Sequence, residues 1–191
     1  MMHFFPVDSL LFCIAERNLQ MKKQLNPKLF TIFFSTLSER IKCTPKNLNR
    51  VIWLSGIRGK GLCVPKSEKV IHALHEFGLI GIEYLNAVPD FSPCKLIRIA
   101  NISITETRSI NFRLCDQHCS EKWNQELFEG KNNWTSTSVA QWRQTHKYTW
   151  HELNDMRSCD LVPSIIHSYF GHLGGVAEVK RKNQADHARP A

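Results

Sequence analysis

The fold is decided by residues 148–175, which read YTWHELNDMRSCDLVPSIIHSYFGHLGG. Residues 148–153 alternate as a β-strand does, a polar turn follows, and residues 159–162 suit a second strand. Pro163 fits the first turn of a helix, and Gly171 suits the end of that helix. Gly174 and Gly175 are likewise expected to terminate the helix, with phosphate contact as the lesser alternative. The order predicts a strand, a turn, a strand and a helix, which is a compact ββα unit.

Ionisable side chains fall where such a unit converges. They are His151 and Glu152 at the end of the first strand, Asp155 in the turn, His167 on the helix and His172 just after it. Imidazoles and carboxylates from a hairpin and a helix make a good site for one divalent cation. Hydrolysis of a phosphodiester needs such a cation to stabilise the leaving oxygen and a base to activate water.

Spacing alone leaves a second interpretation open. Strict alternation puts His151 and Glu152 on opposite faces of the strand, so both reach one metal only if the hairpin twists or bulges. The three histidines also fit two surface residues and one satisfied core group. The pattern therefore indicates a metal site without excluding a structural role.

The sequence before this unit predicts a mixed α/β region. Ser67 suits the N-cap of a helix whose apolar face ends at Gly78. The other expected elements are strands at 51–54, 79–85 and 95–104 and helices at 107–128 and 135–146. Residues 1–48 mix apolar clusters with basic stretches, which fits helical packing or partial disorder equally well.

The composition suits a soluble chain with a polyanionic partner. The 191 residues carry 25 Lys and Arg against 17 Asp and Glu, a formal net charge of +8. Such an excess favours nucleic acid because each neutralised phosphate releases counterions, although many basic proteins bind none. Charge alone therefore shifts the expectation only slightly.

Cysteines and apolar runs exclude several classes. Seven cysteines, an odd number, do not form a disulfide framework, and no pair has zinc-ribbon spacing. Cys115 and Cys119 with His118 lack a second ligand pair, so buried thiols are the preferred interpretation. The apolar runs 10–15 and 29–37 are too short to span a membrane, and we identify no signal peptide.

The ββα segment resembles a known family. Its residues Tyr148 to Glu152, Leu161-Val162-Pro163, Ile166-His167 and His172-x-Gly174-Gly175 are similar to the HNH nuclease domain of colicin-like bacteriocins and polymorphic bacterial toxins. Members commonly carry Trp-His-His or Trp-His-Glu, then Leu-Val-Pro, Ile-His and His-x-Gly-Gly. Weaker matches lie upstream at Gly56-x-Arg58-Gly59, Cys63-x-Pro65, Gly78-Leu-x-Gly81-Ile-Glu-Tyr84, Pro89-Asp-Phe-Ser-Pro93 and Thr107-Arg108-x-x-Asn111-Phe112. The resemblance covers about residues 51–180.

The resemblance implies roles for the site residues. His151, His167 and His172 become the metal ligands, and Glu152 stands where many relatives carry the histidine that acts as general base. A carboxylate with a raised pKa does the same work. A rival assignment makes His151 the base and gives the metal to Asp155, His167 and His172; otherwise Asp155 orients an imidazole.

Basic residues flank the expected site. The candidates for phosphate contacts are Arg143, Lys147, Arg157, Lys180, Arg181 and Lys182. For each of them taken singly, a solvated basic face is the preferred interpretation.

Together these features predict an α+β fold with a C-terminal ββα-metal unit, core at about 147–175, on a mixed α/β support. The expected organisation is an N-terminal region at 1–48, a nuclease domain at 49–182 and a flexible tail at 183–191. The resemblance implies an endonuclease that cuts DNA with one divalent cation, with Mg²⁺, Mn²⁺, Zn²⁺ and Ni²⁺ all open. It also implies an antibacterial toxin made in the bacterial cytoplasm and delivered to target cells, with an acidic immunity protein as partner.

Two alternatives stay open. The first is a ribonuclease, such as a tRNase, on the same scaffold, because the family includes members that cut RNA. The second is a non-catalytic, metal-stabilised domain that binds nucleic acid.

Overall fold

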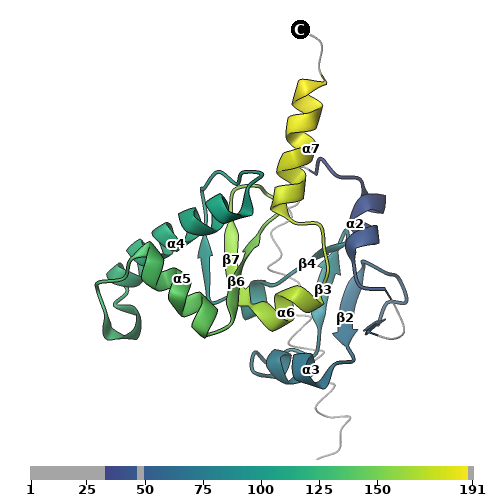
Figure 1. The fold of residues 1–191 in the computed structure, drawn as a ribbon. Helices are drawn as coiled ribbons and strands as arrows, with labels where there is room; N and C mark the ends of the chain where they lie inside the picture. Colours follow the sequence, from purple (N-terminus) through teal and green to yellow (C-terminus); the bar gives the residue numbers. More distant parts are fainter. Residues whose placement is uncertain (1–32, 47–49, 189–191) are drawn as a thin grey trace, which may run out of the picture. The chain divides into compact units, whose positions relative to one another are not determined.

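Two antiparallel sheets form the centre of the described structure (Figure 1). The computed structural model describes residues 33–46 and 50–188. The first sheet has the order β1-β2-β3-β4 and the second the order β5-β7-β6. Their strands are β1 (Val51–Trp53), β2 (Gly61–Pro65), β3 (Ile82–Leu85), β4 (Val88–Pro89), β5 (Ile97–Ile99), β6 (Tyr148–Glu152) and β7 (Cys159–Pro163).

Helices and short 3-10 turns connect and cover these sheets. They are α2 (Leu37–Cys43), α3 (Glu68–His75), η3 (Ser92–Cys94), α4 (Arg108–Gln125), η4 (Phe128–Gly130), α5 (Ser136–Thr145), α6 (Ser164–Tyr169) and α7 (Gly175–His187). This mixture of helices and antiparallel strands confirms the predicted α+β class. In the described part of the chain, no helix is long and apolar enough to cross a bilayer.

The hairpin of β6 and β7 separates two hydrophobic cores. Trp150 and Leu161, which pair across the hairpin, belong to the core shared with α4 and α5. Val162, together with Ile166 and Phe170 of the α6 region, belongs to the core shared with the first sheet and α3. Because successive side chains on a strand point to opposite faces, the residue after Trp150 faces the second core. That residue is His151.

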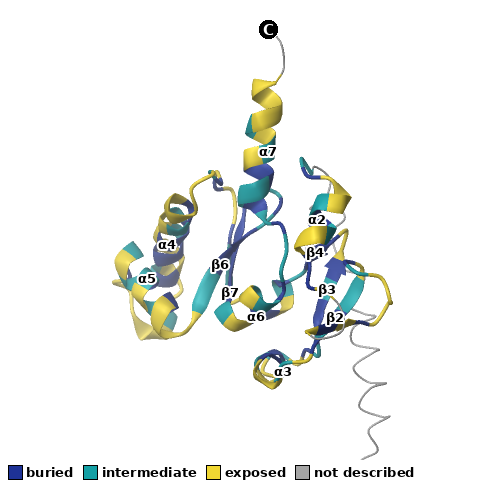
Figure 2. Cartoon of the chain, turned by 45° about the vertical axis from the view of Figure 1, so that its right-hand side comes forward, coloured by how far each residue is buried: buried dark blue, intermediate teal, exposed yellow. Residues whose placement is uncertain are grey.

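Helix α7 corrects two expectations at the end of the ββα segment. Gly174 and Gly175 were expected to end a helix, but Gly174 is the N-cap of α7 and Gly175 its first residue. A Cβ on Gly175 would lie 2.3 Å from the carbonyl oxygen of Leu153, so the glycine permits close packing of α7 on the end of β6. Residues 183–187, expected in a flexible tail, continue this helix, whose outer half is exposed (Figure 2).

The support region differs from the expectation in two strands. The helices expected at 67–78, 107–128 and 135–146 are observed as α3, α4 and α5. Strands β2 and β4 were not predicted. Strand β2 directly follows a glycine-rich loop, and the two-residue strand β4 lies inside the turn expected between β3 and β5. Of the region 1–48, residues 33–46 contain α2, and the rest of that prediction falls outside the described residues.

Candidate metal centre

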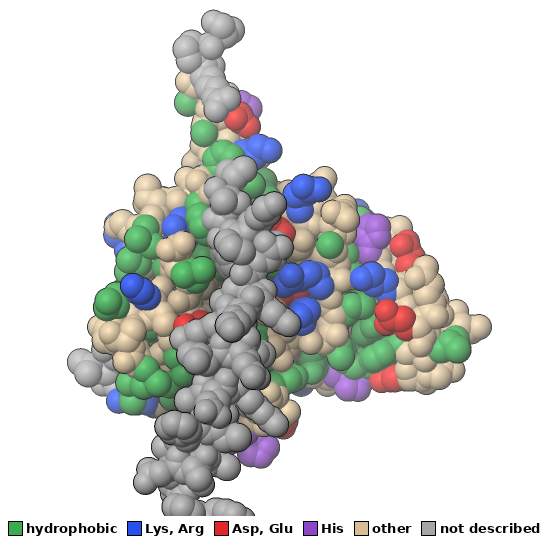
Figure 3. All heavy atoms as spheres, turned by 180° about the vertical axis from the view of Figure 1, so that it is seen from behind, with side chains coloured by type: hydrophobic (Ala, Val, Ile, Leu, Met, Phe, Trp, Pro, Cys, Tyr) green, Lys and Arg blue, Asp and Glu red, His purple; other side chains and the backbone are tan. Residues whose placement is uncertain are grey.

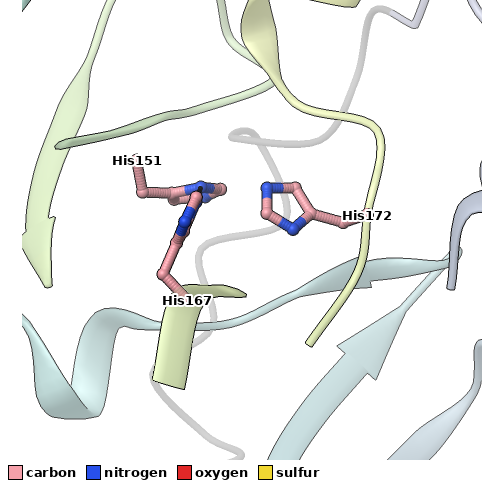
Figure 4. A group of neighbouring side chains, drawn as sticks. All are labelled: His151, His167 and His172. Atoms are coloured by element: carbon pink, nitrogen blue, oxygen red, sulfur yellow. Dashed lines mark hydrogen bonds between the residues drawn. The ribbon is translucent and has the colours of Figure 1, made fainter. Parts of the chain in front are cut away.

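Three imidazoles from three different elements meet at one point (Figure 4). His151 lies on β6, His167 on α6, and His172 in the loop between α6 and α7. One nitrogen from each ring can be chosen so that all three lie within 4.8 Å of one another. In the described part of the chain, this is the one group of three or more such side chains with metal-binding spacing.

The orientation of the rings fits a shared cation. His172 Nδ1 lies 3.0 Å from the carbonyl oxygen of Phe170, so a proton held on Nδ1 leaves Nε2 free as a ligand atom. His151 Nδ1 and His167 Nε2 are 3.3 Å apart. Two nitrogens bound to one tetrahedral ion at about 2.0–2.1 Å lie about 3.3 Å from each other. The separation of this pair therefore matches a metal site, and the ligand nitrogen of His172 lies within 4.8 Å of both.

A buried phenylalanine packs against all three rings. The ring centroid of Phe91 lies 4.9 Å from that of His151, 5.5 Å from that of His167 and 5.6 Å from that of His172. Phe91 is 2% exposed and follows β4 in the motif Pro89-Asp-Phe-Ser-Pro93. The sequence alone predicts no role for this motif, and the structure places its aromatic ring beside the histidines.

Burial keeps the three imidazoles neutral. It lowers the pKa of His151 well below its usual value, with the neighbouring His172 and His167 adding to the effect. Burial likewise lowers the pKa of His167 to about 3 and that of His172 to about 4. Because neutral imidazole is the form that binds a metal, the site is ready to accept a cation at neutral pH.

We expect Phe91→Leu to weaken metal binding more than it weakens the fold. Leucine keeps an apolar side chain in the core, so the loss of stability is about 1 kcal/mol. It removes the ring that packs against the three imidazoles, so we expect Zn²⁺ affinity to fall about 10-fold, the lower end of the cost of losing a group that orients a metal ligand. Calorimetric titration with Zn²⁺ and thermal unfolding of the apo protein separate the two effects. Unchanged Zn²⁺ affinity would contradict a positioning role for Phe91.

Glu152 faces the opposite side of β6 from the histidines. Its Oε1 accepts a hydrogen bond from Asn111 of α4 at 3.3 Å, and its Oε2 lies 3.5 Å from Nε of Arg108. This follows from strand alternation, since Trp150 on the same face also contacts α4, through Asp116. Burial raises the pKa of the Glu152 carboxyl, and the charge of Arg108 opposes that rise.

Arg108 is a site residue that the sequence analysis did not propose. It begins α4, its side chain is 65% exposed, and its charge lowers the pKa of His151, His167 and His172. The guanidinium group therefore acts electrostatically on the imidazoles and lies 3.5 Å from the Glu152 carboxylate. The signal was present in the motif Thr107-Arg108-x-x-Asn111-Phe112, which supplies both partners of the Glu152 carboxylate.

Asp155 stabilises the turn between β6 and β7. Its Oδ1 accepts hydrogen bonds from the backbone N–H groups of Arg157 and Ser158, both at 2.9 Å. Such a bond pattern closes an Asx-type turn. The carboxylate is not part of the histidine group, so the structure does not bring Asp155 together with His167 and His172 as the rival ligand set requires.

The basic residues predicted to contact phosphate fall into two groups. Lys147, Arg157 and Lys180 are exposed, as is Lys182. Arg143, in contrast, is buried and forms a bidentate pair with Asp116 at 2.6 and 2.7 Å, so its guanidinium is not available to a ligand. Arg181 is paired with Glu39 at 2.9 Å. Lys and Arg side chains gather near the middle of the face drawn in Figure 3, with acidic groups among them.

Comparison with protein families decides the affiliation of this segment. Residues 81–174 match the family model described as DNase/tRNase domain of colicin-like bacteriocin. Residues 81–174 belong to this nuclease family. The colicin-type segment includes the hairpin, α6 and all three histidines, and it ends just before α7. No curated protein and no solved structure matches the chain significantly.

Proposed function

We propose that the chain is a metal-dependent endonuclease of the HNH type that hydrolyses phosphodiester bonds in DNA. The observation that carries the proposal is the convergence of His151, His167 and His172, neutral and from three elements, in a segment of a nuclease family. Three protein ligands leave further coordination positions for water and substrate, which is typical of catalytic rather than structural metal sites.

The donor set favours particular cations. Imidazole nitrogens suit Zn²⁺, Ni²⁺ and similar ions, whereas Mg²⁺ prefers carboxylate, carbonyl and water oxygens. The three ligands here are all imidazoles, so we expect Zn²⁺ or Ni²⁺ to bind more tightly than Mg²⁺. A bound cation supplies stabilisation of the charge on the phosphate and on the leaving oxygen.

The remaining residues of the site have distinct tasks. We assign proton abstraction from water to Glu152, because burial raises the pKa of its carboxyl and makes it a better base at neutral pH. The assignment requires this carboxyl to turn from its contacts with Asn111 and Arg108 toward the histidine side of β6. Asn111 and Arg108 hold that carboxylate from α4. His151 keeps the role of ligand, since its ring faces the other two imidazoles.

Arg108 is expected to bind a phosphate next to the metal. Replacing it with glutamine removes one exposed cation, so nucleic-acid affinity falls and the slope of log affinity against log salt decreases by about 1. Binding measured over a range of NaCl concentrations, with metal omitted, checks this. Lys131→Gln is the matched control because Lys131 is exposed and lies at η4, paired with Glu129. An equal change in both variants would contradict the assignment.

The nuclease activity is tested on the purified full chain. After chelation and dialysis, we expect no cleavage of supercoiled plasmid, and we expect cleavage to return with added Zn²⁺, Ni²⁺ or Mn²⁺. A parallel assay on tRNA decides between the DNase and the alternative ribonuclease. If neither substrate is cut while Zn²⁺ raises the melting temperature, the non-catalytic alternative holds.

We further propose that the chain acts as an antibacterial toxin, made in the bacterial cytoplasm and delivered to target cells. The support is the bacteriocin family of residues 81–174. The net charge of +8 suits capture by an acidic immunity protein. Co-expression with a candidate acidic immunity protein tests that partner: the proposal expects the toxicity to the host to be lost.

A further inference from the structure

A buried carboxylate on α7 collects hydrogen bonds from two distant segments. Glu178 is 0% exposed, and its Oε2 accepts from the backbone N–H groups of Phe34 at 2.7 Å and Ser35 at 3.0 Å. Its Oε1 accepts from the Ser35 hydroxyl and from Nδ2 of Asn154 at 3.3 Å. A buried carboxylate is stable only when such donors replace water.

Asn154 connects the Glu178 carboxylate to the metal centre. Its Nδ2 also donates to the carbonyl oxygen of Leu173 at 2.8 Å, and Leu173 is the residue after His172. Asn154 itself lies just beyond the end of β6, the strand that carries His151. One amide group therefore links the hairpin to the loop of His172.

The two ends of that loop are held by different groups. Before His172, the hydroxyl of Tyr84 donates to the carbonyl oxygen of Gly171 at 3.0 Å. After it, the hydrogen bond from Asn154 to Leu173 fixes the backbone. In the described part of the chain, Asn154 Oδ1 has no hydrogen-bond partner, so the two bonds from Nδ2 must compensate for burying the whole amide.

The segment before the first sheet belongs to the same network. Arg40 of α2 is buried, and its Nη1 donates to the carbonyl oxygen of Ser35 at 2.6 Å and to the Ser35 hydroxyl at 3.0 Å. Its Nε donates to the carbonyl oxygen of Asn86 between β3 and β4, the hairpin that precedes Phe91. Residues 33–40 thus tie α7 to the hairpin that leads to the ring packed on the histidines.

We propose that Glu178 is a positioning residue for the metal centre, acting through Asn154 on the loop of His172. The inference rests on the proposed function, because it assumes that the histidines bind a cation. It extends the functional unit beyond the family match, since Glu178 and residues 33–40 both lie outside residues 81–174. The nuclease site therefore needs both flanks of that segment.

The test compares two buried carboxylates in the full chain. Glu178→Gln removes an acceptor and places an N–H group against the donors of Ser35 and Asn154. We expect Zn²⁺ affinity, measured by calorimetry well below the melting temperature, to fall about 10–100-fold. Asp116→Asn is the matched control, because Asp116 is 3% exposed and accepts from Arg143 and Trp150 on the opposite core. We expect it to lower stability and leave Zn²⁺ affinity within about 2-fold of wild type.

A double-mutant cycle identifies the route. If Glu178 acts through Asn154, then Asn154→Ala alone weakens Zn²⁺ binding to a similar extent, and the double variant loses little more than either single one. Asn154→Ala also carries the test if Glu178→Gln does not fold. Equal Zn²⁺ affinity in wild type and in both single variants would overturn the inference alone. Absence of Zn²⁺ binding by the wild-type chain would overturn the proposed metal centre as well.

Discussion

Replacing His167 with alanine is expected to abolish nuclease activity and to weaken Zn²⁺ binding by more than about 100-fold. His167 is the ligand contributed by α6, and its Nε2 lies 3.3 Å from Nδ1 of His151. Loss of an outer partner of a metal ligand typically costs ~10–100-fold in affinity, so loss of a ligand itself costs more. Zn²⁺ titration and plasmid cleavage by the same preparation measure both effects.

The control for this variant is His118→Ala. His118 lies on α4, is half-exposed and sits 3.4 Å from Glu121 in a surface pair, and it is not part of the histidine group. Its removal leaves Zn²⁺ affinity and cleavage unchanged. Because His167 sits in a partly apolar surrounding with a pKa of about 3, its loss leaves no charge unpaired, and the circular dichroism of the variant should match wild type. Cleavage at the wild-type rate by His167→Ala would remove the histidine site from the mechanism.

The sequence predicted the three histidines because each one falls in a different part of a short ββα pattern. Strand alternation also predicted that His151 and Glu152 lie on opposite faces of β6. In the structure Glu152 faces α4, while His151 faces the other core. Asp155 looked like a ligand because its type fits a metal. An Asp followed by polar residues at a hairpin also predicts an Asx turn, and that local bond is what forms.

Residues contributed from distant parts of the chain were not predictable from spacing. Arg108 stands far upstream of the hairpin, and only the packing of α4 on β6 brings it to Glu152. Phe91 reaches the histidines from the end of the first sheet. Arg143 was predicted to contact phosphate. The sequence does not reveal that its guanidinium pairs with Asp116, which lies 27 residues earlier on α4.

The glycine pair shows why a local pattern has two interpretations. Glycine ends helices because it accepts positive φ, and it also permits two backbones to approach closely. Gly174 has a φ of −93°, so the conformational reason does not apply to it. Gly175 meets backbone atoms of Glu152 and Leu153, so close approach is the reason there. A helix end and a close backbone approach both favour glycine, so the sequence cannot distinguish them without the position of α7.

Gly175→Ala is therefore expected to destabilise the protein by about 3 kcal/mol, the upper part of the range for overpacking a core. The added Cβ would lie 2.3 Å from the carbonyl oxygen of Leu153 and 3.1 Å from its carbonyl carbon. Both are backbone atoms next to β6, so no side chain can turn aside, and α7 has to move. For a chain of this size the melting temperature falls by roughly 6–12 °C, measured by calorimetry on the apo protein.

Gly78→Ala separates this steric effect from backbone strain. Gly78 has a φ of +66°, but a Cβ there meets nothing within 4 Å, so the loss is limited to the cost of a left-handed residue, about 1 kcal/mol. The movement of α7 in Gly175→Ala also displaces Glu178, one turn further along the helix, and hence the amide of Asn154. Zn²⁺ affinity should then fall in Gly175→Ala and stay unchanged in Gly78→Ala. Equal stabilities for the two variants would mean that α7 does not pack against the end of β6 as tightly as the contact with Leu153 requires.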